Sequence, residues 1–172
     1  MSLNPSFASN AGAFGGAYTF PFTSSSGVNF NQKLGVCHSS APQPNDGTFL
    51  CNDKIIGGYW YNSAGLGTAT EFKSPLDNSG HGTHTASIAG GNRVTATVGG
   101  SPVISGVAPR ARLIAYKACW DGDPNNPDDG GCGSADSLSA INQAILDGVN
   151  VINYSIGGGI NPIGDPDRKS VV

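Results

Sequence analysis

One run of small and polar residues, 77–87 (Asp-Asn-Ser-Gly-His-Gly-Thr-His-Thr-Ala-Ser), constrains this chain more than any other feature. Turn and N-cap residues at 77–79 precede a small, mildly apolar stretch, Thr83 to Ala89, and Gly90-Gly91 tolerates the left-handed conformation in which many helices end. The run predicts a short helix with His81 at its mouth, behind a glycine turn. A histidine held this way has a fixed backbone while its ring faces a cleft, as a general base requires.

The segment 81–86 (His-Gly-Thr-His-Thr-Ala) resembles the histidine signature of the subtilisin-like serine proteases, the subtilases. The resemblance implies that His81 is the general base that takes a proton from a serine nucleophile, and that His84 is a structural residue of the helix. In a simpler interpretation, both histidines merely begin a helix.

A metal site at His81 and His84 is a second alternative, because residues three apart can share one helix face. The zinc-protease signature, however, needs His-Glu-x-x-His, and here only Gly82 and Thr83 stand between the histidines. We therefore expect no metal at this run and no cofactor, and leave open calcium in an intact parent protein.

Further stretches follow in the order of the family. Residues 106–118 resemble its segment in which a Gly-Val-Ala-Pro turn feeds a buried strand. Pro109 ends the preceding element, and Leu113 to Ala118 is predicted to form a short strand in an enclosed sheet.

Residues 134–147 have a helical pattern, with Ser134 as a cap and Asp136 in the first turn. Leu138, Ile141 and Ile145 fall on one face of this helix. Gly148 is predicted to end it, and 149–154 (Val-Asn-Val-Ile-Asn-Tyr) to form the next strand.

Residues 155–158 (Ser-Ile-Gly-Gly) resemble the family's Ser-Leu-Gly-Gly segment, whose exposed backbone lines the substrate cleft. The resemblance implies that Ser155, Ile156 and Gly157 hold a polypeptide substrate through main-chain hydrogen bonds, with glycine allowing close approach. The alternative is an ordinary strand end followed by a glycine turn.

The first part of the chain resembles the larger, plant-type subtilases at 51–58 (Cys-Asn-Asp-Lys-Ile-Ile-Gly-Gly) and at 4–7 (Asn-Pro-Ser-Phe). Ala8 to Phe30 shows no clear period and is predicted to be loop. We divide the chain into a loop-rich insertion segment, 1–53, and an α/β core, 54–172, that contains the histidine motif.

The family's mechanism also needs an aspartate in Asp-(Thr or Ser)-Gly and a serine in Gly-Thr-Ser-Met-Ala, and neither motif occurs here. Asp77 stands where family members carry a turn residue, so we interpret it as structural. We expect the chain to be the N-terminal to middle part of a serine endopeptidase domain, inactive by itself. The alternative is a non-catalytic remnant of the same fold that binds peptides or a partner.

A net charge of −3 and 12% charged residues give no reason to expect nucleic-acid or anionic-membrane partners. No apolar run approaches the length of a membrane span, and Ser2 to Pro5 lacks the basic start and apolar core of a signal peptide. The oligomeric state stays open.

The four cysteines allow three disulfide pairings, and free buried thiols are an alternative. A zinc site is disfavoured because no Cys-x-x-Cys occurs. The family resemblance implies the pairs Cys37–Cys51 and Cys119–Cys132. Two disulfides would place the parent protein in an oxidising compartment, so we expect it to be secreted.

Alternating strand and helix signals predict an α/β fold with a mainly parallel sheet. The resemblance implies part of the subtilisin-like three-layer fold, with helices on both faces of that sheet. It also implies that the strand carrying the aspartate is missing. We therefore expect uncovered strand edges and apolar helix faces, and doubt that the chain is stable alone.

Overall fold

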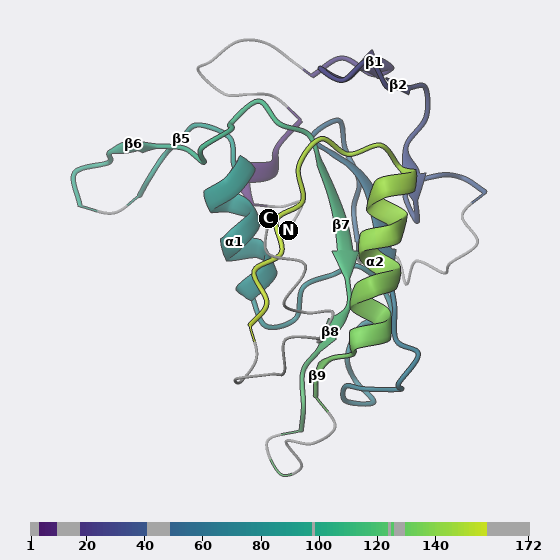
Figure 1. Ribbon diagram of the computed structural model, residues 1–172. Helices are drawn as coiled ribbons and strands as arrows, with labels where there is room; N and C mark the ends of the chain where they lie inside the picture. The colour runs from purple at the N-terminus through teal and green to yellow at the C-terminus, as the bar shows by residue number, and fades with distance from the viewer. Residues whose placement is uncertain are drawn as a thin grey trace.

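The computed structural model describes residues 4–9, 18–40, 49–97, 99–123, 125 and 130–157. Figure 1 shows two α-helices beside a small sheet, with short two-stranded ribbons around them. The elements are η1 (Pro5–Phe7), β1 (Phe22–Thr23), β2 (Asn29–Phe30), β3 (Leu34–Gly35), β4 (Ile55–Trp60), α1 (His81–Gly90), β5 (Val94–Thr95), β6 (Val103–Ile104), β7 (Leu113–Lys117), β8 (Cys119–Trp120), β9 (Gly131–Cys132) and α2 (Ser134–Leu146).

The central sheet has the order β3-β4-β7, and both neighbouring pairs run parallel. β4 and β7 form the longer ladder, in which Tyr59 lies opposite Tyr116 and Trp60 opposite Lys117. In the described part of the chain the other sheets are antiparallel ribbons of two strands: β1-β2, β5-β6 and β8-β9. The strand predicted at 113–118 is confirmed.

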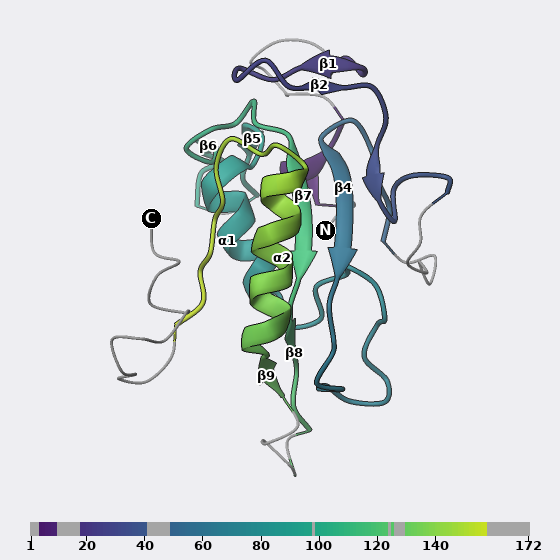
Figure 2. The ribbon, with the colours of Figure 1, turned by 45° about the vertical axis from the view of Figure 1, so that its right-hand side comes forward.

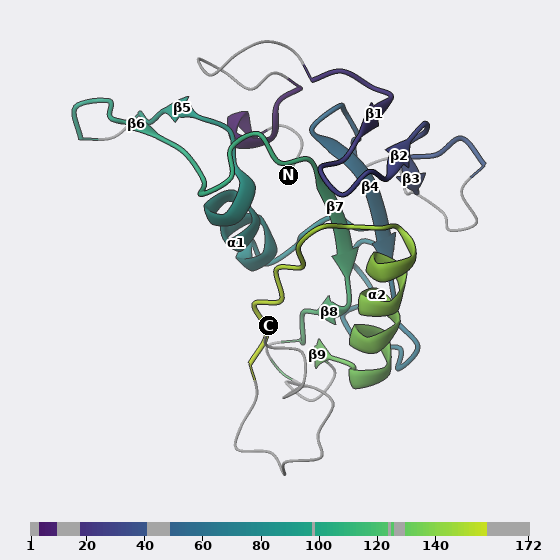
Figure 3. The ribbon, with the colours of Figure 1, turned by 45° about the horizontal axis from the view of Figure 1, so that its top comes forward.

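The two helices cover opposite faces of this sheet, as the rotated views in Figures 2 and 3 illustrate. Successive residues of a strand point to opposite faces. Leu113 and Ala115 of β7 pack with Ala86 of α1 around the core, whereas the Tyr116 hydroxyl donates to Asp147 at the end of α2. The predicted α/β fold, with a parallel sheet between helices, is confirmed.

The hydrophobic core lies on the α1 side of the sheet, where Phe7, Val36, Phe49 and Ile55 form one buried cluster. Phe7 comes from η1 and is fully buried. Burial of apolar side chains such as these stabilises the fold by roughly 1.5–3 kcal/mol for each large side chain. The cluster therefore ties the N-terminal segment to β4 and α1.

The end of α1 differs from the prediction. Gly91 follows the helix with a φ of −65°, which is not left-handed. Crowding requires glycine here instead. Gly106 lies against the end of α1, and a Cβ on Gly106 would lie 2.5 Å from the Gly91 nitrogen and 2.6 Å from the Ser87 carbonyl oxygen. The glycines here serve the close approach of two backbone segments.

Helix α2 ends as predicted but begins differently. Gly148 has a φ of +72°, and Val149 N donates to Ala144 O at 3.2 Å, as in a Schellman C-cap. At the other end Gly133 is the N-cap, and no side chain caps the helix. The prediction that Ser134 caps α2 is wrong, because it already lies within the helix.

Two of the three residues on the predicted apolar face of α2, Leu138 and Ile145, do not face the sheet. Leu138 and Ile145 are 50% and 65% exposed, whereas Ala140 and Ala144 are buried. On this face of the sheet, Tyr59 and Tyr116 stack with ring centroids 5.3 Å apart. Because the two stacked rings fill the space next to the sheet, we infer that only small side chains such as Ala140 and Ala144 fit on the helix face opposite them. Leu138 and Ile145 thus stay at the surface, whereas Ile141 is half-buried and lines a cavity.

Two further predictions are corrected. The stretch predicted as loop from Ala8 to Phe30 contains the β1-β2 ribbon, in which Phe22 stacks on Phe30. Residues 149–154, predicted as a strand, have no strand assignment and pair with no strand in the described structure. Val151 in this segment is 84% exposed. A cavity separates it from the nearest strand, β7.

Candidate active site around His81

His81 is the first residue of α1 and its side chain is exposed. The preceding Gly80 has a φ of +88°, a left-handed conformation that glycine adopts without the steric cost of a side chain. The glycine turn therefore sets where the helix begins, and the helix start in turn fixes the backbone of His81. This is the placement that the sequence predicted.

Asp77 fastens the first turn of α1. Its Oδ2 accepts a hydrogen bond from Thr83 N at 2.7 Å, and its Oδ1 accepts one from Gly80 N at 3.0 Å. Burial alone would raise the pKa of Asp77, but these hydrogen bonds outweigh it and hold the pKa below its ordinary value. Asp77 thus has the structural role predicted from its position.

A buried ion pair anchors the loop that carries Asp77. Lys117 of β7 lies 2.7 Å from Glu71 and also donates to Leu76 O at 3.1 Å. The second Glu71 oxygen accepts from Asp121 N at 2.9 Å, and the Lys117 ammonium lies 4.3 Å from the Trp120 ring centre. Sequence reasoning missed this network. A lysine at the end of an otherwise uncharged strand was the available signal.

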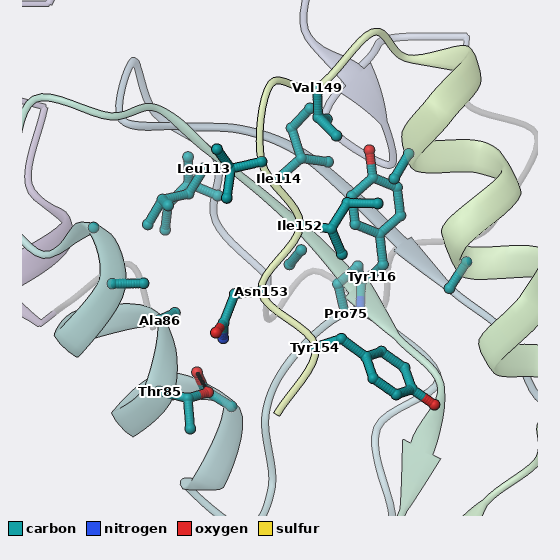
Figure 4. Close-up of a pocket in the computed structure, with 18 of the residues that line it drawn as sticks. Pro75, Thr85, Ala86, Leu113, Ile114, Tyr116, Val149, Ile152, Asn153 and Tyr154 are labelled. Carbon is teal, nitrogen blue, oxygen red and sulfur yellow. Dashed lines mark hydrogen bonds between the residues drawn. The ribbon is translucent and has the colours of Figure 1, made fainter. Parts of the chain in front are cut away.

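A cavity of about 810 Å³ opens between α1, β7 and residues 149–156, and His81 lines it. Figure 4 shows Thr85 and Ala86 on the α1 side and Val149, Ile152 and Tyr154 on the opposite side, with the side chain of Asn153 pointing toward α1. The walls are largely apolar, but His81 and the polar loop residues Asp77, Asn78 and Ser79 that precede it also line the cavity.

Two of the predicted substrate-binding residues, Ser155 and Ile156, line this same cavity. Gly157 follows them in the chain and is exposed. The Ser155 hydroxyl donates to Asn153 Oδ1 at 3.2 Å. No strand of the described structure pairs with the backbone of this stretch. The fold therefore brings His81 and the 155–156 backbone around one space.

His84 lies one turn further along α1 and is exposed, as expected of a helical residue away from the core. In the described ranges, no group of three or more His, Cys, Asp or Glu side chains could hold a metal ion. The absence of a metal site at His81 and His84 stays a prediction.

Both cysteine pairs implied by the resemblance are disulfides in the structure. Cys37–Cys51 joins the end of β3 to the segment before β4, beside the core. Cys119–Cys132 joins opposite residues of the β8-β9 ribbon, just beyond β7. Among the described residues, neither helix is long and apolar enough to cross a membrane.

Comparison with known proteins identifies the family. The sequence profile of the subtilase family matches residues 46–171, which is most of the chain. The chain belongs to the subtilase family. The matched range contains the histidine run and the 155–157 segment, so His81 and the candidate substrate-binding residues lie within it.

Plant subtilases are among its similar relatives. The chain is 41% identical to the subtilisin-like protease SBT1.5 of Arabidopsis thaliana over 137 residues, 74% of this chain and 16% of that protein. It is 43% identical to SBT1.6 over 136 residues and 42% identical to SBT3.13 over 139 residues, both from the same plant. These matches cover 73% of this chain in each case, and 16% and 18% of the two relatives. The chain thus spans less than a fifth of the length of these subtilases.

Proposed function

We propose that this chain is part of a serine endopeptidase that hydrolyses peptide bonds in proteins, with His81 as the general base. The observation that carries the proposal is the place of His81, exposed at the start of α1 and on a cavity that Ser155 and Ile156 also line. A general base needs a fixed backbone and a ring within reach of bound substrate, and the position of His81 on the cavity supports this role.

In the proposed reaction, His81 takes the proton of a serine hydroxyl as that oxygen attacks the peptide carbonyl, and later returns it to the leaving amine. The backbone at Ser155, Ile156 and Gly157 holds the substrate by main-chain hydrogen bonds. No aspartate or serine motif of the family occurs in these 172 residues. We therefore propose that both act from a longer polypeptide, and that the 172-residue chain alone does not cleave proteins.

The test uses a polypeptide that combines this chain with the family's aspartate and serine motifs. His81→Ala should lower kcat about 10⁶-fold, because a triad without its base loses nearly all its catalysis. His84→Ala is the matched control and should retain near-normal turnover, because it lies outside the proposed site. Near-normal turnover of the His81 variant would show that His81 is not the general base.

We further propose that the parent protein is secreted, because both disulfides require an oxidising environment to persist. The proposed chemistry needs no cofactor, since a Ser-His-Asp triad acts through its own side chains. Its partner is a polypeptide substrate, and nothing in the charge of the chain indicates a nucleic acid.

A non-catalytic peptide-binding module is the second candidate. The observation that favours it is the 155–157 backbone, which pairs with no strand of the described structure and is largely exposed. Binding of unfolded peptides by the wild-type chain and by His81→Ala separates the two functions. Equal binding, together with no cleavage by the longer polypeptide, would favour the module.

A further inference from the structure

Asp121 comes directly after β8 and lines the same cavity as His81. Its Oδ2 accepts a hydrogen bond from Asn78 Nδ2 at 2.7 Å, and Asn78 belongs to the loop that precedes His81. Its backbone N–H donates to Glu71 Oε2 at 2.9 Å, so the buried ion pair of Glu71 with Lys117 also fixes its main chain. These contacts hold the Asp121 carboxylate next to the loop that carries the proposed general base.

Three carboxylates line the cavity, those of Glu71, Asp77 and Asp121, and the first two are occupied within the protein. Glu71 pairs with Lys117 at 2.7 Å, and Asp77 accepts from two backbone N–H groups at the start of α1. Asp121 differs from both: in the described part of the chain no lysine or arginine forms an ion pair with it, and no group donates to its Oδ1. That oxygen and the negative charge are therefore available to a bound ligand.

The arginines of the cavity lie away from Asp121. Arg110 and Arg112 line the cavity from the stretch before β7, whereas Asp121 follows β7 and β8. The five residues of β7 span about 16 Å, which exceeds the Debye length of about 8 Å at physiological salt. Between Asp121 and Cys132 the sequence contains no lysine or arginine. The part of the cavity next to Asp121 therefore favours a cation.

We propose that Asp121 is a specificity-determining residue, which selects polypeptide substrates with a lysine or arginine side chain close to the cleaved bond. The ammonium or guanidinium group of the substrate donates to Asp121 Oδ1 in a charge-assisted hydrogen bond, while the substrate backbone lies along residues 155–157. A neutral side chain in the same place leaves this charge unpaired, so the site discriminates by charge. This inference rests on the proposed function and adds the chemical class of the substrate.

The test titrates the 172-residue chain with two acetylated, amidated peptides and follows binding by NMR. One peptide is Ala-Ala-Lys-Ala-Ala, and the other has norleucine, a neutral side chain of similar length, in place of lysine. At low salt the lysine peptide should bind at least about fivefold more tightly, and added salt should reduce the difference. Binding of the lysine peptide should also shift the side-chain amide signals of Asn78, which contacts Asp121.

Two variants separate the site from the general charge of its loop. Asp121→Asn removes the charge and keeps an amide oxygen for Asn78, so it should bind the two peptides equally. Asp123 lies two residues further on and does not line the cavity. Asp123→Asn makes the same change of charge in the same loop and should keep the lysine preference.

The longer polypeptide of the His81 test gives a kinetic check. There, Asp121→Asn should lower the ratio of kcat/KM for the lysine peptide to kcat/KM for the norleucine peptide at least about fivefold. If Asp121 acted only through its hydrogen bond to Asn78, both values would fall together. The ratio would then be unchanged, which would overturn the proposal.

Equal binding of the two peptides by the wild type would also overturn it, as would a lysine preference that Asp121→Asn retains or that Asp123→Asn loses to the same extent. The NMR titration measures binding alone. Absence of a lysine preference would therefore leave the role of His81 standing, whereas near-normal turnover of His81→Ala would remove that role without changing the peptide preference.

Discussion

At the scale of single residues, Lys54 is an unusual member of the interior. Its side chain is fully buried, and its ammonium donates to Tyr18 Oη at 3.1 Å, Pro109 O at 3.0 Å and Ala111 O at 2.5 Å. Burial among these neutral oxygens, together with the charge of Arg112, lowers the pKa of Lys54 to about 8. Lys54 thus links the N-terminal segment to the segment before β7, and burial of its charge lowers the free energy gained from these hydrogen bonds.

This lowered pKa predicts a pH dependence of stability. Between the folded value of about 8 and the unfolded value of 10.5, the unfolded chain binds more protons, so the free energy of unfolding rises with pH. From pH 7.5 to pH 9.5 the rise should be on the order of 2 kcal/mol by urea unfolding. Lys54→Met should abolish the rise.

The pH range stops at 9.5 because the tyrosines act in the opposite sense. Burial and then the charge of Asp147 raise the pKa of Tyr59, and burial and a hydrogen bond to Asp147 raise that of Tyr116. Above about pH 10 the unfolded tyrosines lose protons first, which lowers stability. If the free energy of unfolding of Lys54→Met rose with pH as much as that of the wild type, the pH dependence would belong to another group.

At the scale of elements, the start of α1 depends on a strand that it does not adjoin in sequence. Lys117 of β7 pairs with Glu71, and the side chains are only 9% and 2% exposed. Lys117→Met should leave a buried unpaired carboxylate and lower the free energy of unfolding by about 3–5 kcal/mol. Faster amide exchange at Thr83, whose N–H binds Asp77, should accompany the loss.

The double variant Lys117→Met/Glu71→Gln is the control for this prediction. It replaces the buried, unpaired Glu71 carboxylate with a neutral amide whose oxygen still accepts from Asp121 N. The double variant should therefore recover more than half of the free energy of unfolding that Lys117→Met loses. A loss below 1 kcal/mol in Lys117→Met, or no recovery in the double variant, would contradict an anchoring role of the ion pair.

At the scale of the whole molecule, the exposed stripe on α2 should govern solution behaviour. Leu138, Ile145 and Leu146 are 50%, 65% and 79% exposed. Exposed apolar patches favour association, so we expect the 172-residue chain to self-associate in sedimentation velocity. Leu138→Lys/Ile145→Lys should shift it toward monomer without loss of helical circular dichroism, whereas Ser139→Lys should not. A wild-type chain that stays monomeric at high concentration would contradict this prediction.

Local chemistry determined the elements that the sequence predicted correctly. The glycine turn at Gly80 and the Asp77 side chain place His81 at the start of α1, and Gly148 ends α2 in its left-handed conformation. Each of these features is encoded within a few residues of chain. The disulfide pairs were a different case, because they followed from the family resemblance and not from the residues alone.

Tertiary structure alone decided the features that depend on distant neighbours. Small residues of α2 face the sheet because stacked tyrosines from two strands occupy that face. Residues 149–154 have a strand-like sequence but stay unpaired, because a strand forms only when another backbone lies beside it. The burial of Lys54 likewise depends on carbonyl groups more than fifty residues away. The sequence alone specifies where α1 starts and where α2 ends, whereas packing between distant segments sets which faces are buried and where the cavity beside His81 lies.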